Sequence, residues 1–221
     1  FLKHALHIQP LDAELSEPDP AAFGNILHTV LQRAGEIPET LNTTDADTLT
    51  DHLRELLGRE YERRYGRTPA LPITLSRQAA EDRLAAFARA QVALVHDGWR
   101  VLAVETPTGR TLADLTLQGR IDRIDRHEGT GALRIIDYKT GRLTGNKNPA
   151  AEAHLAGFRG TCESWQQFDD KRRWINLQLP LYVWLYGTAD TRIEPCYFVI
   201  AAEHPDTGLR PWADFDAAHV A

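Results

Sequence analysis

Residues 119–141, GRIDRIDRHEGTGALRIIDYKTG, constrain the fold more than any other segment of the chain. Apolar and polar residues alternate along two runs, and a glycine-bearing turn from Gly129 to Gly131 joins them. A period of two predicts β-strands, and a short glycine-containing connection predicts that they pair antiparallel. The segment therefore predicts a hairpin in a sheet, with charged side chains on both of its strands.

Three side chains of this hairpin point to a common chemistry. Asp137 and Lys139 are two residues apart, so they share one face of their strand while Tyr138 points the other way. Pairing of the two strands brings Asp122 towards the same patch. Two carboxylates in a half-buried sheet repel each other unless a cation neutralises them, and Mg²⁺ meets that need. This is the layout of a divalent-metal nuclease centre.

The first half of the chain is predicted to be helical. Asp19 and Pro20 occupy N-cap and N1 positions for a helix through residues 23–34. Apolar spacing predicts a second helix over about 45–65, and Ser76 is expected to cap a third helix that ends near residue 98.

From Trp99 onward the period changes to two. We expect strands at 100–106, 116–125 and 132–140, separated by turns at 107–109 and 129–131, in an antiparallel meander. Residues 141–170 are polar and are expected to form a long loop. A helix at about 171–186 then follows, which Pro180 is expected to kink or to open in its hydrogen bonding, and a last strand is expected at about 196–202.

Composition limits the classes of protein. With 221 residues and 43% hydrophobic content, the chain is expected to form one domain over 1–221, with a helical part (1–98) before a sheet-containing part (99–221). A net charge of −6 argues against a broad basic DNA-coating surface. Cys162 and Cys196 lack metal-ligand spacing, so we expect buried structural cysteines, a reduced cytoplasmic compartment and no iron–sulfur cluster. No apolar run is long enough to span a membrane.

Four short motifs occur in an order typical of one nuclease family: a helical histidine, an aspartate-bearing strand, an Asp-X-Lys strand and a Gln-X3-Tyr helix. They contain His28, Asp122, Asp137, Lys139, Gln178 and Tyr182. Together they resemble the RecB-type branch of the PD-(D/E)XK nucleases, and the resemblance covers most of the chain. It is closest to the C-terminal nuclease domains of bacterial RecB and AddB enzymes, which begin with a similar FLK helix and DPAAFGNILH segment.

The resemblance implies a fold and a metal site. The fold would be α/β, a restriction-endonuclease-like αβββαβ core with a mixed central sheet, preceded by additional helices. The metal ligands would be His28, Asp122, Asp137 and the main-chain carbonyl of Tyr138, with Mg²⁺ as the ion and Mn²⁺ as the alternative.

The resemblance also implies roles in catalysis and positioning. Lys139 would be the catalytic lysine, acting with Asp122 and Asp137 to orient or deprotonate the attacking water. Gln178 and Tyr182, four residues apart, would position DNA or the lysine from one helix face. Glu105 is a candidate outer carboxylate, and a solvated strand end is an equally good interpretation of it.

The biological context is implied by the resemblance alone. It indicates a DNA exonuclease acting on single strands, taken from the C-terminus of an ATP-dependent helicase–nuclease of double-strand-break repair and recombination. The helicase motor would lie in the same full-length chain or in a partner subunit, and the enzyme would act at the nucleoid. No ATP site is expected in this chain, because residues 141–147, GRLTGNK, lack the Walker spacing.

Other interpretations remain open. The chain could be a noncatalytic DNA-binding or scaffolding domain of a helicase complex, or a hydrolase of another phosphate ester with a closed pocket. His28 could be a core helix histidine, and Asp125 is expected to be an exposed strand carboxylate paired with a nearby arginine. Trp165 and Trp174 could stack on bases or pack in the core. A run of arginines could line a DNA groove or form a solvated helix face: Arg59, Arg63, Arg64 and Arg67.

Overall fold

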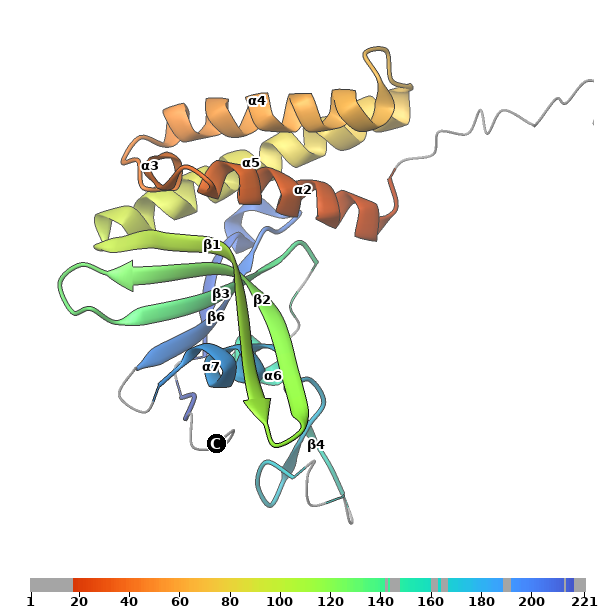
Figure 1. Ribbon diagram of the computed structural model, residues 1–221. Helices are drawn as coiled ribbons and strands as arrows, with labels where there is room; N and C mark the ends of the chain where they lie inside the picture. The colour runs from red at the N-terminus through yellow and green to blue at the C-terminus, as the bar shows by residue number, and fades with distance from the viewer. Residues whose placement is uncertain are drawn as a thin grey trace, which may run out of the picture.

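A five-stranded mixed sheet lies at the centre of the molecule, with helices on both of its faces (Figure 1). The computed structural model describes residues 18–141, 143, 148–159, 163, 167–188, 192–212 and 214–216. The strand order is β1-β2-β3-β6-β7. The strands are β1 (Trp99–Leu112), β2 (Leu115–His127), β3 (Leu133–Lys139), β6 (Ile193–Val199) and β7 (Gly208–Pro211).

The first three strands form the predicted antiparallel meander, β6 runs parallel to β3, and β7 runs antiparallel to β6. One face carries α2 (Pro20–Gly35), α3 (Pro38–Leu41), α4 (Ala46–Tyr65) and α5 (Leu71–His96). The other carries α6 (Pro149–Glu152), α7 (Gln178–Tyr186) and a small sheet of β4 (Leu155–Gly157) and β5 (Arg172–Trp174). A 3-10 turn, η2 (His204–Asp206), precedes β7. The α/β, restriction-endonuclease-like expectation is confirmed.

Helix α2 begins as its sequence predicts. The Asp19 carboxylate accepts a hydrogen bond of 2.7 Å from the Ala22 amide, and Pro20 follows it at the first helical position. Helix α5, in contrast, begins at Leu71, so the expectation that Ser76 caps it was wrong. The buried Ser76 hydroxyl instead lies 2.9 Å from the Tyr61 hydroxyl, where it joins α5 to α4.

Strands β1 and β2 are longer than expected and extend as an arm beyond the sheet (Figure 1). The turn expected at residues 107–109 was wrong, because the chain turns only between Leu112 and Leu115. Strand β1 lies at the edge of the sheet. Pro107 has no backbone N–H to donate, and an edge strand tolerates this because one of its sides has no neighbouring strand. The turn at Gly129 to Gly131 is confirmed, and the Gly131 amide donates to the His127 carbonyl.

The region before α7 also differs from expectation. Residues 172–174 form β5, and the helix begins only at Gln178, so the helix expected from residue 171 was wrong. Pro180 therefore lies in the first helical turn, where backbone N–H groups have no helical acceptor, and it does not kink the helix. The described part of the expected loop at 141–170 contains α6 and β4.

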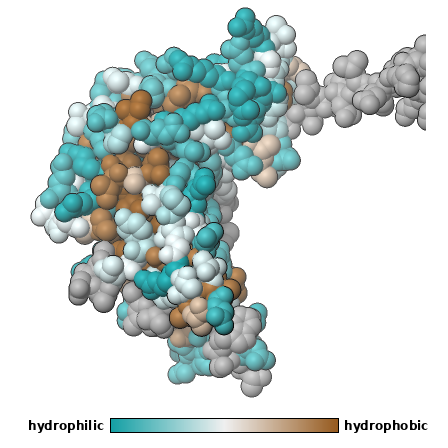
Figure 2. Space-filling model, viewed as in Figure 1, coloured by the Kyte–Doolittle hydropathy of each residue, from teal (hydrophilic) through white to brown (hydrophobic). Residues whose placement is uncertain are grey.

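The sheet is buried on both faces. On the α2–α5 side, Tyr138 and Phe198 are buried and pack against Phe87. Figure 2 shows mainly hydrophilic side chains on the outer surface of the helices, and apolar side chains at the surface below them in this view. On the other side Leu179, Tyr197 and Trp212 form a second cluster.

Because both faces are covered, Asp125 is fully buried, and the expectation that it is exposed was wrong. It does pair with an arginine as expected: Arg123 donates two hydrogen bonds of 2.6 Å to its carboxylate, and Arg123 is fully buried as well.

The structure also shows where one cysteine and one tryptophan of the sequence analysis lie. Cys196 is buried, as expected, and Trp174 packs against Phe168 and Trp212. Cys162, Trp165, the FLK segment and most of GRLTGNK lie outside the described residues. Among the helices that the structure describes, none is long and apolar enough to cross a membrane.

The arginines of α4 are engaged by carboxylates. Arg59 pairs with Glu55 at 2.5 Å and Arg67 pairs with Glu62. Arg63 and Arg64 both bind the fully buried Glu60, which also receives Arg33 of α2. These ion pairs agree with the solvated-face interpretation, and they tie α2 to α4 through one buried carboxylate.

Glu60→Gln is expected to remove a pH-dependent part of the stability. The hydrogen bond from Arg63 lowers the pKa of Glu60 from 4.5 to about 2, and Arg64 adds to this against the opposing effect of burial. Because the pKa of Glu60 is lower in the folded state than in the unfolded state, its ionised carboxylate stabilises the fold fully above pH 4.5. That stabilisation is lost as the pH falls towards 2. Because Arg63 is partly exposed, we expect ionised Glu60 to contribute no more than about 2 kcal/mol to the free energy of unfolding.

Urea unfolding of the parent and variant at neutral pH and at about pH 3 checks this. The difference in unfolding free energy should shrink on acidification. Glu62→Gln, at an exposed ion pair on the same helix, is the matched control and should change stability by less than about 1 kcal/mol at either pH. Equal losses from both variants would contradict the prediction.

Candidate active site

The sheet brings the three charged residues of the hairpin together. Strands β2 and β3 pair Arg123 with Ile136, which places Asp122 opposite Asp137 one step further along. The Asp122 Oδ2 atom accepts a hydrogen bond of 3.0 Å from the Tyr138 amide. Both carboxylates therefore lie at one end of the β2–β3 ladder.

His28 reaches this point from α2. Its Nε2 lies 3.0 Å from the Tyr138 carbonyl oxygen, and its Nδ1 lies 3.5 Å from Asp122 Oδ2. The approach depends on Gly24, one helical turn earlier on the same face, because a Cβ there would lie 2.9 Å from Thr140 Oγ1. The glycine lets α2 come close enough to the end of β3 for the imidazole to reach the sheet. His28 is one-third exposed and is not a core histidine.

Gln178 links the helix α7 to the Asp-X-Lys strand. Its Nε2 donates to Asp137 Oδ1 at 2.7 Å, and its Oε1 accepts from Lys139 Nζ at 3.1 Å. The ammonium also lies 2.7 Å from Asp137 Oδ2, and the Tyr182 hydroxyl lies 3.4 Å from Gln178 Nε2. Because α7 begins at Gln178, the side chain projects from the first turn onto the sheet. The amide therefore holds the lysine and the aspartate in one fixed arrangement.

Burial and mutual repulsion set the charge of the two carboxyls. Burial and, after it, the charge of the nearby Asp137 together raise the pKa of Asp122 to about 6, against the opposing effects of the Tyr138 amide and His28. Burial also raises the pKa of Asp137, while the Lys139 ammonium lowers it. Both acids are thus less readily ionised than free carboxyls, so a cation bound between them would gain from relieving their repulsion.

Glu105 lies beside the pair rather than at a solvated strand end. It is opposite Asp122, between the β1–β2 pairs formed by Val104 and Thr106, and its charge contributes to the raised pKa of Asp122. Its backbone has φ of 48°, a left-handed conformation that costs a non-glycine residue energy. Arg120 approaches its carboxylate at 3.6 Å.

The donor atoms at this point suit a hard divalent ion. Within the described part of the chain, no three His, Cys, Asp or Glu side chains converge as a ready metal-binding group. The buried Asp137 Oδ2, however, accepts no well-directed hydrogen bond, although the lysine ammonium is close to it. The 3.0 Å between His28 Nε2 and the Tyr138 oxygen matches the separation of about 3 Å between neighbouring ligands of an octahedral Mg²⁺. Carboxylates, a carbonyl and an imidazole therefore fit such an ion here.

Two residues near the site were missed from sequence. The Tyr197 ring lies under the Lys139 ammonium, 5.0 Å from ring centroid to Nζ, and its hydroxyl lies 2.8 Å from Nε2 of the buried His154. Burial lowers the pKa of His154 to about 4, so the ring is neutral, and its Nδ1 lies 2.9 Å from the Asn176 carbonyl. His154 comes from the segment expected to be a loop, where no periodic pattern signals burial.

Comparison with known proteins places the chain in a family. The family described as the PD-(D/E)XK nuclease superfamily matches residues 1–208, a span that contains every residue of the candidate site. No curated protein matches the chain.

Proposed function

The chain belongs to the PD-(D/E)XK nuclease superfamily, and on this premise we propose that it is a Mg²⁺-dependent deoxyribonuclease. Membership makes it a nuclease, a hydrolase of phosphodiester bonds. The observation that carries the finer proposal is the bonded set of Asp137, Lys139 and Gln178 beside Asp122 and His28. A carboxylate pair for the ion and an ammonium held next to it are what metal-assisted phosphodiester hydrolysis requires.

The roles follow from the contacts. Asp122, Asp137, His28 and the Tyr138 carbonyl would hold the ion, which when bound supplies Lewis acidity and makes water more acidic. Lys139, held by Asp137 and Gln178, can donate a hydrogen bond to the attacking water or to a phosphate oxygen on which charge builds.

The outer residues orient this set. Gln178 fixes the lysine, Tyr182 borders the amide from the same helix, and Glu105 adds negative charge beside Asp122.

We further propose single-stranded DNA as the substrate and exonucleolytic cleavage as the mode of action. A helicase in the same full-length chain or in a partner subunit would deliver the strand during double-strand-break repair and recombination. The resemblance of the four motifs to RecB and AddB nuclease domains supports this context.

Cleavage assays test the proposal. End-labelled linear single-stranded and duplex DNA, and internally labelled covalently closed circular single-stranded DNA, are incubated with Mg²⁺ or with chelator. The proteins are the parent, Asp137→Asn and the exposed control Asp170→Asn. We expect cleavage of linear single strands that chelator and Asp137→Asn both abolish and that Asp170→Asn retains. Resistance of the circular strand would support an exonuclease. Cleavage that survives chelation would overturn the metal proposal, and a folded, metal-binding protein that cleaves nothing would favour a noncatalytic DNA-binding role.

A further inference from the structure

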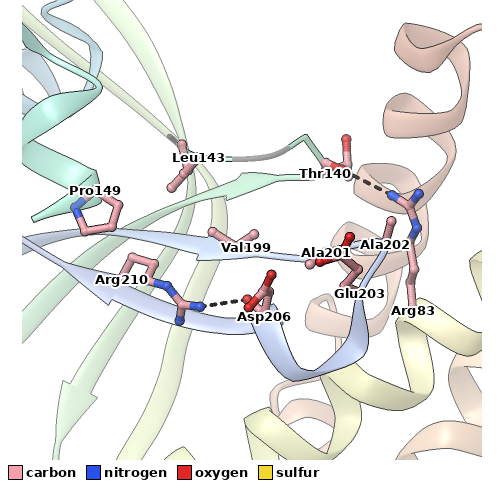
Figure 3. Close-up of a pocket in the computed structure, with 10 residues that line it drawn as sticks. All are labelled: Arg83, Thr140, Leu143, Pro149, Val199, Ala201, Ala202, Glu203, Asp206 and Arg210. Carbon is pink, nitrogen blue, oxygen red and sulfur yellow. Dashed lines mark hydrogen bonds between the residues drawn. The ribbon is translucent and has the colours of Figure 1, made fainter. Parts of the chain in front are cut away.

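A cavity of about 450 Å³ lies next to the candidate active site, at the carboxyl ends of β3 and β6 (Figure 3). Its lining includes Thr140, which directly follows the catalytic-lysine position, and Val199 at the end of β6. Arg83 of α5 and Arg210 of β7 contribute to it from two different elements.

The cavity lies at the end of the sheet face that carries Asp137. Cross-strand partners project to the same side of a sheet. Asp137 of β3 is paired with Tyr197 of β6, and Tyr197 is paired with Arg210 of β7, so the three residues form one row across three strands. Lys139 and Val199 form the next row. Arg210 thus lies two strands, about 10 Å, from the carboxylate on the same face.

Among the described residues, Arg83 has one hydrogen-bond acceptor, and it lines the cavity. Nη1 donates to the Thr140 carbonyl at 3.2 Å, and the guanidinium lies over the Phe23 ring, 4.7 Å from its centroid. It forms no ion pair with any carboxylate of the described residues, and burial alone lowers its pKa. A guanidinium has five N–H donors, so a half-buried one without a counter-charge can still bind an anion.

Arg210 is held in a similar way. It donates to two backbone carbonyls, those of Asp206 at 2.8 Å and Leu209 at 3.0 Å, and no described carboxylate pairs with it. Glu203 and Asp206 also line the cavity, and both are exposed. The negative charge of these two carboxylates repels an anion, so the cavity can bind an anion only through its two arginines.

We propose that this cavity binds a backbone phosphate of the DNA strand next to the bond being cut, through Arg83 and Arg210. The inference rests on the proposed function, which it deepens by naming the path of the strand. The sheet face itself is covered, but a single strand that leaves the carboxylates along the carboxyl ends of β3 and β6 would reach this cavity. Phosphate neutralised by arginine is the usual source of sequence-independent affinity for nucleic acid.

Equilibrium binding of a fluorescent single-stranded oligodeoxynucleotide, in chelator and over a range of salt concentrations, tests the inference. The variants are Arg83→Gln, Arg83→Lys and Arg210→Gln. The matched control is Arg89→Gln, at an exposed arginine of the same helix. Glu203→Gln is a control of opposite sign, because it removes a negative charge from the cavity.

Arg83→Gln and Arg210→Gln should each weaken binding by about tenfold, since a hydrogen bond to a charged group is lost. Each should also reduce the slope of log K against log salt by about 0.7, the value for one phosphate contact of a single strand. Arg83→Lys should keep the slope, Arg89→Gln should change neither quantity, and Glu203→Gln should tighten binding. If Arg83→Gln fails to fold, as its thermal melt would reveal, Arg210→Gln decides the question.

Three outcomes would overturn the inference: no measurable binding by the parent protein, an unchanged salt slope in both cavity variants, or effects equal to those of Arg89→Gln. A mononucleotide that competes as strongly as unlabelled oligonucleotide would assign the cavity to a free product instead of a strand. Cleavage is not measured here, so the two proposals fail separately. A protein that binds through the arginines without cutting DNA would contradict only the nuclease proposal, and one that cuts with unchanged binding would contradict only this one.

Discussion

Lys139→Ala is expected to lower the rate of DNA cleavage by about 10²–10⁴-fold, the usual contribution of a positioned proton-transfer group. The ammonium lies 2.7 Å from Asp137 and 3.1 Å from Gln178, so it is held beside the carboxylate to which the proposed mechanism assigns the ion. The measurement is single-turnover cleavage of a labelled single strand at saturating Mg²⁺. Saturation matters because the lysine contacts Asp137, a proposed metal ligand, so its removal is expected to change the metal affinity as well as the rate.

Two further variants distinguish the role of the lysine in cleavage from the effect of its charge. Lys171→Ala removes an exposed lysine elsewhere and should leave the rate unchanged. Lys139→Arg keeps the charge but changes the shape of the donor, and it should recover metal affinity more fully than rate. If Lys139→Ala stayed within a few-fold of the parent at every Mg²⁺ concentration, the lysine would serve only as the ionic partner of Asp137.

Asp125→Ala is expected to destabilise the fold by about 3–5 kcal/mol, because it leaves the buried Arg123 guanidinium without its counter-charge. Both residues are fully buried, and the pair is bidentate. Urea unfolding of Asp125→Ala measures this loss, and a cycle of Asp125→Leu, Arg123→Met and the Asp125→Leu/Arg123→Met double variant gives the coupling between the two residues.

The double variant should be more stable than Asp125→Ala, since replacing a whole buried ion pair by apolar side chains costs less than orphaning one charge. Asp114→Ala, at the exposed tip of the arm, is the control and should change little. Losses that simply add would mean that the two charges stabilise the fold independently.

The ion pair also adjoins the candidate site. Arg123 Nη1 lies 3.4 Å from the Tyr138 hydroxyl, and the Tyr138 backbone supplies both the amide bonded to Asp122 and the carbonyl bonded to His28. The side chain of Tyr138 is thus packed on one face of the sheet while its backbone forms part of the site at the strand end. The buried ion pair and the packed Tyr138 side chain therefore help to hold the backbone of the site in place.

Much of the site could be predicted from local sequence. The period of two places Asp137 and Lys139 on one face of a strand, and the short turn places Asp122 on its neighbour. The four-residue spacing places Gln178 and Tyr182 on one side of a helix. These relations depend only on backbone geometry over a few residues, and the structure brings all five side chains together as expected.

Other features depended on contacts between distant segments. Asp125 was expected to be exposed because its strand is rich in charge, yet helices cover both faces of the sheet and bury it. Pro180 was expected to kink a helix, yet β5 delays the start of that helix until Gln178. Nothing local to His154 indicates that it contacts Tyr197, 43 residues away in sequence.

Local sequence patterns were sufficient to predict the hairpin, the pairing of its charged residues and the family of the chain, because backbone sterics and side-chain alternation act over a few residues. The packing of distant segments, in contrast, sets which charges are buried, how far the pKa of Asp122 rises, and that Arg83 and Arg210 meet in one cavity. Burial, desolvation and cavities arise where elements far apart in the chain pack together, and the separation between residues in sequence does not set those distances.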